Sequence, residues 1–198
     1  MIYIVIVALI GVIIFCYTQF RKGKGQKVEK DALTLAWEKK DYPAYLALID
    51  EKIAKTGNRK EKHILATLKL PVYILTEEWA QMDALKSHVK TSELPKKIRV
   101  RFICQYIIGL CLSDRPDAAL KWIEKEAPLL KEAEANGSYE LYINSVRGLE
   151  SFYRGDLEKS RAIFKDLQSK NIAGALYPNL FKDYLQRIET LTEESEEK

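Results

Sequence analysis

The sequence has few of the residues on which most enzymes and metal sites depend. Its three cysteines in 198 residues are too few for a disulfide framework, which is typical of a reducing compartment. Neither His63 nor His88 has neighbours at a metal-ligand spacing. The nine glycines form no phosphate-binding loop, and no paired carboxylates stand out. We therefore expect no metal, no cofactor and no small-molecule substrate, with an unrecognised enzyme site as an alternative.

Net charge is confined to one short segment. The chain has 32 basic and 28 acidic residues, and residues 21–30 contain five of the basic residues but one acidic residue. The remainder is therefore balanced, with 27 residues of each sign. Because nucleic-acid binding needs a net basic face, this balance argues against a nucleic-acid partner.

Residues 2–20 form an apolar run without a charged residue. Twelve of them are Ile, Val, Leu or Phe, each of which favours membrane insertion by roughly 0.3 to 0.6 kcal/mol. A helix of this length is close to the thickness of the hydrocarbon core. A cleaved signal peptide is the main alternative, but its positive charges would precede the apolar run instead of following it. The sequence predicts a transmembrane helix over residues 1–20.

The basic residues that follow this run predict its orientation. Lys and Arg beside a spanning helix stay on the cytoplasmic side and contact anionic headgroups of the lipid bilayer. We expect a single-pass protein of the cell membrane, with its N-terminus outside. The remaining regions are then a linker over 21–30, a cytoplasmic domain over 31–190 and an acidic, disordered tail over 191–198. The predicted membrane-surface residues are Arg21, Lys22, Lys24, Lys27 and Lys30.

Turn signals divide the domain into four helical hairpins. Helix-start residues occur at Asp41, Glu77, Asp114 and Asp156, which are 36, 37 and 42 residues apart. A second set of breaks lies between them, at residues 56–58, 91–95 and 136–138. Apolar periodicity predicts helices near residues 43–55, 77–90, 102–112, 116–134, 156–169 and 175–191. The predicted fold class is all-α, with stacked antiparallel hairpins behind one transmembrane helix and an interruption at Pro71.

The hairpins resemble the tetratricopeptide repeat family over roughly residues 29–170. The best match is the fourth hairpin, where a small residue, a turn glycine and a second-helix aromatic stand at the family's spacing. These residues are Gly148, Gly155 and Phe164, with Ser160 in place of the usual alanine. The resemblance implies an α-solenoid whose concave groove holds a peptide or helix of another protein.

Four residues are candidates for partner binding. Lys97 and Arg101, one helical turn apart, look like the basic pair with which some family members grip a terminal carboxylate. The alternative is that Lys96, Lys97, Arg99 and Arg101 are a solvated helix start. Tyr139 and Tyr142 are candidate aromatic anchors, because tyrosine is frequent in interfaces, although packing between hairpins also explains them.

The predicted function is that of a membrane-anchored cytoplasmic scaffold or adaptor. Its layout of one span, basic residues and repeats resembles anchored tetratricopeptide proteins of bacterial envelope assembly. The alternative function is a structural or regulatory subunit that pairs with its complex through the transmembrane helix itself.

Overall fold

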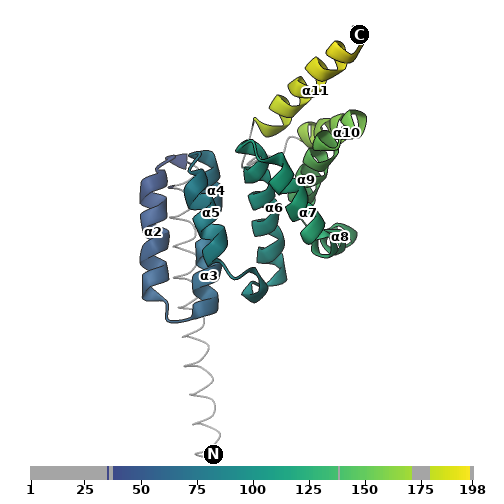
Figure 1. Ribbon diagram of the computed structural model, residues 1–198. Helices are drawn as coiled ribbons and strands as arrows, with labels where there is room; N and C mark the ends of the chain where they lie inside the picture. The colour runs from purple at the N-terminus through teal and green to yellow at the C-terminus, as the bar shows by residue number, and fades with distance from the viewer. Residues whose placement is uncertain (1–34, 36–37, 138, 171–178, 197–198) are drawn as a thin grey trace, which may run out of the picture. The chain divides into compact units, whose positions relative to one another are not determined.

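The computed structural model describes residue 35 and residues 38–137, 139–170 and 179–196 (Figure 1). Every regular element in these ranges is a helix, which confirms the predicted all-α class for them. The described chain divides into two units, with the boundary between Lys55 and Thr56. The predicted membrane span, residues 1–20, and the basic linker, residues 21–30, lie outside the described residues.

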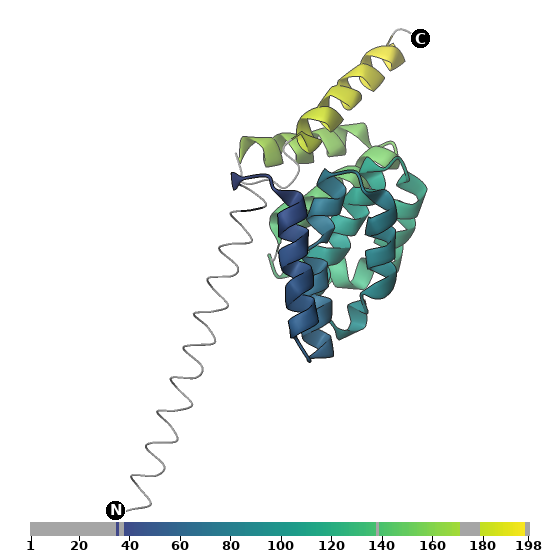
Figure 2. The same cartoon turned by 90° about the vertical axis from the view of Figure 1, so that its left-hand side faces the viewer.

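The first unit contributes one helix, α2 (Tyr42–Lys55). The second unit contains helical hairpins followed by a C-terminal helix. Both views place that last helix, α11, beyond α9 and α10 (Figures 1 and 2). The elements of the second unit are α3 (Arg59–Thr67), α4 (Leu70–Leu75), α5 (Trp79–His88), η2 (Thr91–Glu93), α6 (Lys96–Leu112), α7 (Pro116–Lys125), α8 (Ala127–Ala135), α9 (Glu140–Tyr153), α10 (Leu157–Ser169) and α11 (Leu180–Glu196).

Two prolines decide where helices are interrupted. The predicted interruption at Pro71 is confirmed, because α3 ends at Thr67 and α4 begins with Pro71 in its first turn. The single helix predicted over 116–134 is wrong. It is two helices that meet at Glu126, and Pro128 lies in the first turn of α8. A proline has no N–H for the carbonyl four residues earlier, so it begins a helix more readily than it continues one.

The turns that precede α2, α5, α7 and α10 share one backbone feature. Each contains a single left-handed residue two positions before the next helix begins: Lys40, Glu77, Asp114 and Gly155, with φ between 54° and 83°. In three of these turns, the following N–H donates to the carbonyl five residues earlier, at 2.8–2.9 Å. This is the bond of a Schellman helix end. The backbone therefore repeats at intervals of 37, 37 and 41 residues.

Helix capping agrees with the sequence at two of these turns and differs at two. The Oδ1 atoms of Asp41 and Asp156 accept hydrogen bonds from Ala44 N and Lys159 N, at 3.0 and 3.2 Å. At the other two turns, the N-caps of α5 and α7 are Glu78 and Arg115, which make no capping bond from their side chains. The left-handed residue occupies the position at which we expected the cap, so the helix starts later.

The core of the second unit is centred on α6. Every residue from Phe102 to Cys111 is buried, as expected from the apolar run over 102–112. Helices α3, α4 and α5 contact α6, as do α7, α8 and α9. Because α6 touches helices from both neighbouring hairpins, it has no wide solvent-facing side. The polar residue inside this stretch, Gln105, is 2% exposed.

The α9–α10 hairpin is closely packed where the family resemblance is strongest. A Cβ atom added to Gly148 would lie 2.7 Å from the ring of Phe164, so only a glycine fits without a shift. The hydroxyl of Ser160, which is fully buried, donates a 2.9 Å hydrogen bond to the carbonyl of Gly148. These two contacts bring the helix backbones together, as the predicted small residues require.

Helix α11 covers the end of the α9–α10 hairpin with aromatic side chains. Tyr184 contacts the ring of Phe152 edge to face at a centroid distance of 5.0 Å, and Phe181 lies 5.9 Å from Phe164. The Tyr153 and Tyr184 hydroxyls form a 2.6 Å hydrogen bond. Burial is the main cause that raises the pKa of Tyr184.

The acidic segment does not fray where the sequence predicted. Helix α11 continues to Glu196, so the expected disordered tail over 191–198 is wrong for residues 191–196. A side-chain contact helps to extend the helix, because Arg161 Nη2 on α10 donates to the Thr192 hydroxyl at 2.7 Å.

The repeated turn geometry predicts a selective effect of substitution at Gly155. We expect Gly155→Ala to lower the free energy of unfolding by about 1 kcal/mol, because an alanine is strained at positive φ. Urea unfolding of the full chain, followed by circular dichroism, measures this loss. The control is Gly57→Ala, at a position with open space around it and no left-handed backbone. An equal loss in the two variants would contradict the prediction.

Candidate functional site

Two predicted partner-binding residues lie on helices α6 and α9, which contact each other. Arg101 and Tyr142 are both half-buried, and the charge of Arg101 acts directly on the Tyr142 hydroxyl. Gln105, one turn after Arg101, acts on the same hydroxyl as a hydrogen-bond partner. Lys97 is exposed and lies one turn before Arg101 on the same row of the helix. We call these four residues, Lys97, Arg101, Gln105 and Tyr142, the α6–α9 surface.

The chemistry of this surface combines a cation with a neutral phenol. Burial raises the pKa of Tyr142, while the positive charge of Arg101 and hydrogen bonding by Gln105 lower it. A tyrosine with a raised pKa is neutral at physiological pH, so its hydroxyl can donate a hydrogen bond. A guanidinium beside a phenol donor is a suitable arrangement for a carboxylate ligand.

The basic side chains at the start of α6 divide into those that form ion pairs and those that do not. Arg99 pairs with the buried Glu126 at 2.7 Å, and Lys96 pairs with Glu132 on α8. Among the described residues, Lys97 and Arg101 have no carboxylate within ion-pair distance. The cluster is therefore more than a solvated helix start, because half of it attaches α6 to its neighbours and half of it is unpaired.

Tyr139 is in a different situation from Tyr142. It precedes α9 with φ at 62°, in the left-handed region, and its half-buried ring packs against the hydrophobic core. Tyr142 also packs against this core, so the packing interpretation applies to both tyrosines, and Tyr142 is the one whose hydroxyl is affected by the charge of Arg101. The predicted membrane-surface residues, Arg21, Lys22, Lys24, Lys27 and Lys30, lie outside the described residues.

Sequence reasoning missed Gln105, although a signal was present. It is the one amide in the apolar run of α6, and a polar side chain inside such a run needs a partner. Its partner, Tyr142, is 37 positions later in the sequence, so only the packing of α9 on α6 brings the pair together.

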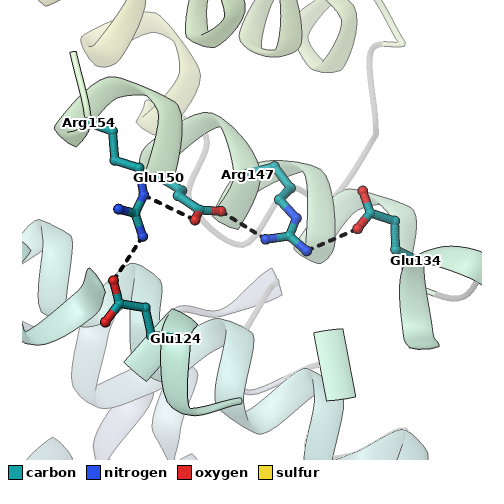
Figure 3. A network of polar contacts seen from close by, with 5 residues as sticks. All are labelled: Glu124, Glu134, Arg147, Glu150 and Arg154. Carbon is teal, nitrogen blue, oxygen red and sulfur yellow. Dashed lines mark hydrogen bonds and ion pairs between the residues drawn. The ribbon is translucent and has the colours of Figure 1, made fainter. Parts of the chain in front are cut away.

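A network of ion pairs connects α9 to the neighbouring helices α7 and α8 (Figure 3). Arg147 on α9 contacts Glu134 on α8 at 3.0 Å and Glu150 at 2.8 Å. Arg154 contacts the same Glu150 at 3.3 Å and Glu124 on α7 at 3.1 Å. Each carboxylate of the network has a cation, so these five residues form a structural connection between α7, α8 and α9.

The described residues contain no group of three or more His, Cys, Asp or Glu that could hold a metal ion. Burial raises the pKa of the Cys104 and Cys111 thiols to about 12, so neither is a reactive thiolate at neutral pH.

Within the described part of the chain, no helix has both the length and the apolar character needed to cross a membrane.

In its described part, the chain is thus all-helical, with a left-handed residue in the turns before α2, α5, α7 and α10. Comparison of the chain with models of protein families, with curated proteins and with solved structures finds no match.

The ion-pair network predicts a measurable contribution from Glu150. We expect Glu150→Gln to lower the free energy of unfolding by about 1 kcal/mol, because it removes the carboxylate that two arginines share. The control is Glu189→Gln, at an exposed position on α11. Urea unfolding at low and high salt measures both variants, and the difference between them should decrease at high salt. Equal stabilities of the two variants would contradict this role of Glu150.

Proposed function

We propose that this protein is a membrane-anchored scaffold whose cytoplasmic helical domain binds a carboxylate-bearing segment of another protein. The main support is the unpaired guanidinium of Arg101 beside the half-buried Tyr142. An arginine that has lost part of its hydration and has no acidic partner binds a carboxylate at a lower desolvation cost than a fully hydrated one. Lys97 adds a second positive charge one turn away.

We further propose that the hairpins form a solenoid of the tetratricopeptide type. The recurring left-handed turns at intervals of 37, 37 and 41 residues support this arrangement. So does the contact of glycine with phenylalanine inside the α9–α10 hairpin. In such a stack, the first helices of successive hairpins line the groove, and α6 and α9 are first helices. The α6–α9 surface then lies where a bound segment would run.

The membrane anchor in this proposal rests on the apolar run over residues 2–20 and on the basic segment that follows it. An anchored scaffold holds its partner close to the bilayer, which raises the local concentration of the two proteins. Orientation by the basic segment places the α6–α9 surface in the cytoplasm.

Site-directed crosslinking in cells tests the binding surface. A photoreactive residue at the exposed position Lys97 should capture a specific protein, and Arg101→Gln should reduce this product about tenfold, as expected for a charged hydrogen-bonded contact. Tyr142→Phe should reduce it less, because one hydroxyl is removed. The control is Lys131→Gln, which removes an exposed charge on α8. The proposal fails if Arg101→Gln and Lys131→Gln leave the same amount of product.

Fractionation tests the anchor independently. The full chain should sediment with membranes and stay there in alkaline carbonate, whereas deletion of residues 2–20 should release it to the soluble fraction. Protease added outside intact cells should leave the C-terminal region intact. A full chain found in the soluble fraction, or cleaved from outside, would contradict the proposed anchor or its orientation.

A further inference from the structure

Two lysines contact the same indole ring. They belong to α5 and α7, which contribute no residue to the α6–α9 surface. Lys86 Nζ, near the end of α5, lies 4.3 Å from the centroid of the Trp122 ring on α7. Lys125 Nζ, in the last turn of α7, lies 4.4 Å from the same centroid. Lys86 also lies 6.0 Å from the centroid of the Tyr106 ring on α6. One aromatic ring is thus in contact with two ammonium groups of like charge.

The ring between these lysines is held in place by groups that are already paired. Tyr106 contacts Trp122 edge to face at 5.5 Å, and its hydroxyl donates a 3.0 Å hydrogen bond to Asp83 Oδ1. The other carboxylate oxygen of Asp83 accepts from Arg115 Nη1 at 2.7 Å. Both oxygens of Asp83 are therefore bound to Tyr106 and Arg115, and neither forms an ion pair with the two lysines.

Neither lysine has a counter-ion in the described part of the chain. No carboxylate lies within ion-pair distance of Lys86 or Lys125 there, whereas the neighbouring Glu126 is buried against Arg99 at 2.7 Å. Burial and the charge of Lys125 both lower the pKa of Lys86, and Glu126 opposes this effect. Contact with an aromatic face compensates a desolvated ammonium in part only.

We infer that Lys86 and Lys125 bind carboxylates of an acidic segment of a partner protein, which lies over Trp122. Two neighbouring carboxylates would supply one counter-charge for each ammonium, and the indole ring would cover the apolar part of the segment. This surface uses α5 and α7, so it does not depend on the proposed role of Arg101 and Tyr142.

The charges around the lysine pair favour a discrete acidic segment over an extended anionic surface. Helix α7 has two acidic residues, Asp117 and Glu124, against two basic ones, Lys121 and Lys125. Binding to an anionic membrane or to nucleic acid requires a cluster of basic residues without interspersed acids. The half-buried Lys86 is also better reached by a side chain than by a flat lipid surface.

A binding assay with a hexaglutamate peptide tests this inference. The full chain is kept in a neutral detergent, and the anisotropy of a fluorescent label on the peptide reports binding. We expect Lys86→Gln with Lys125→Gln to weaken the affinity at least tenfold. The charge-matched control, Lys121→Gln with Lys131→Gln at two exposed positions, and the single variants Lys121→Gln and Arg101→Gln should each change it less than twofold. Loss through Arg101→Gln instead would assign the peptide to the α6–α9 surface and overturn the inference.

The emission of Trp122 provides a readout that general charge effects do not produce. In a chain with Trp37→Phe and Trp79→Phe, Trp122 is the remaining tryptophan. Its emission should shift when the peptide draws the lysines from the ring, and the shift should vanish in the double lysine variant. The inference is overturned if Lys121→Gln weakens binding equally. It is also overturned if the peptide does not bind while vesicles of phosphatidylglycerol bind through the two lysines.

Discussion

The structure of residues 56–137, 139–170 and 179–196 depends on the burial of one stretch of α6, residues 102–111. Residues Phe102 to Cys111 of α6 are all buried between the helices before and after it. Burying a large apolar side chain stabilises a protein by roughly 1.5 to 3 kcal/mol, so a helix with several of them supplies much of the core. The same burial fixes the first turns of α6, where Lys96 and Arg99 pair with acidic residues of its neighbours. Because these pairs hold the start of α6 in place, the positions of Lys97 and Arg101 on the same helix turns are also fixed.

The sequence predicted the helices better than their ends. Apolar periodicity is a property of many residues, so the helices near 43–55, 77–90 and 156–169 could be found from it. The break at Glu126 was missed because the apolar spacing of α7 continues into α8 across Pro128. The caps at α5 and α7 were missed for another reason. Lys40, Glu77 and Asp114 have positive φ, a conformation in which glycine is the usual residue. Because these three residues are not glycine, the sequence does not reveal their left-handed conformation.

The residues of the candidate sites also differ in how far the sequence predicts them. Lys97 and Arg101 were visible as a basic pair at helical spacing, because both belong to one helix. Tyr142, whose hydroxyl is affected by the charge of Arg101, belongs to α9, and the Lys86–Trp122–Lys125 contact joins α5 to α7. A sequence read along the chain does not reveal which distant helices will lie side by side. The distinction between paired and unpaired charges is likewise visible only in three dimensions, where Arg99 has Glu126 and Arg101 has no carboxylate partner among the described residues.

The aromatic cover formed by α11 has a consequence for self-association. A row of helical hairpins always has a last member, and the side that would receive a further hairpin is apolar. In this chain, Phe181 and Tyr184 occupy that side of α9 and α10, and the polar face of α11 meets the solvent. Within the described residues, α11 therefore covers this apolar side of the α9–α10 hairpin and makes it inaccessible to a second molecule.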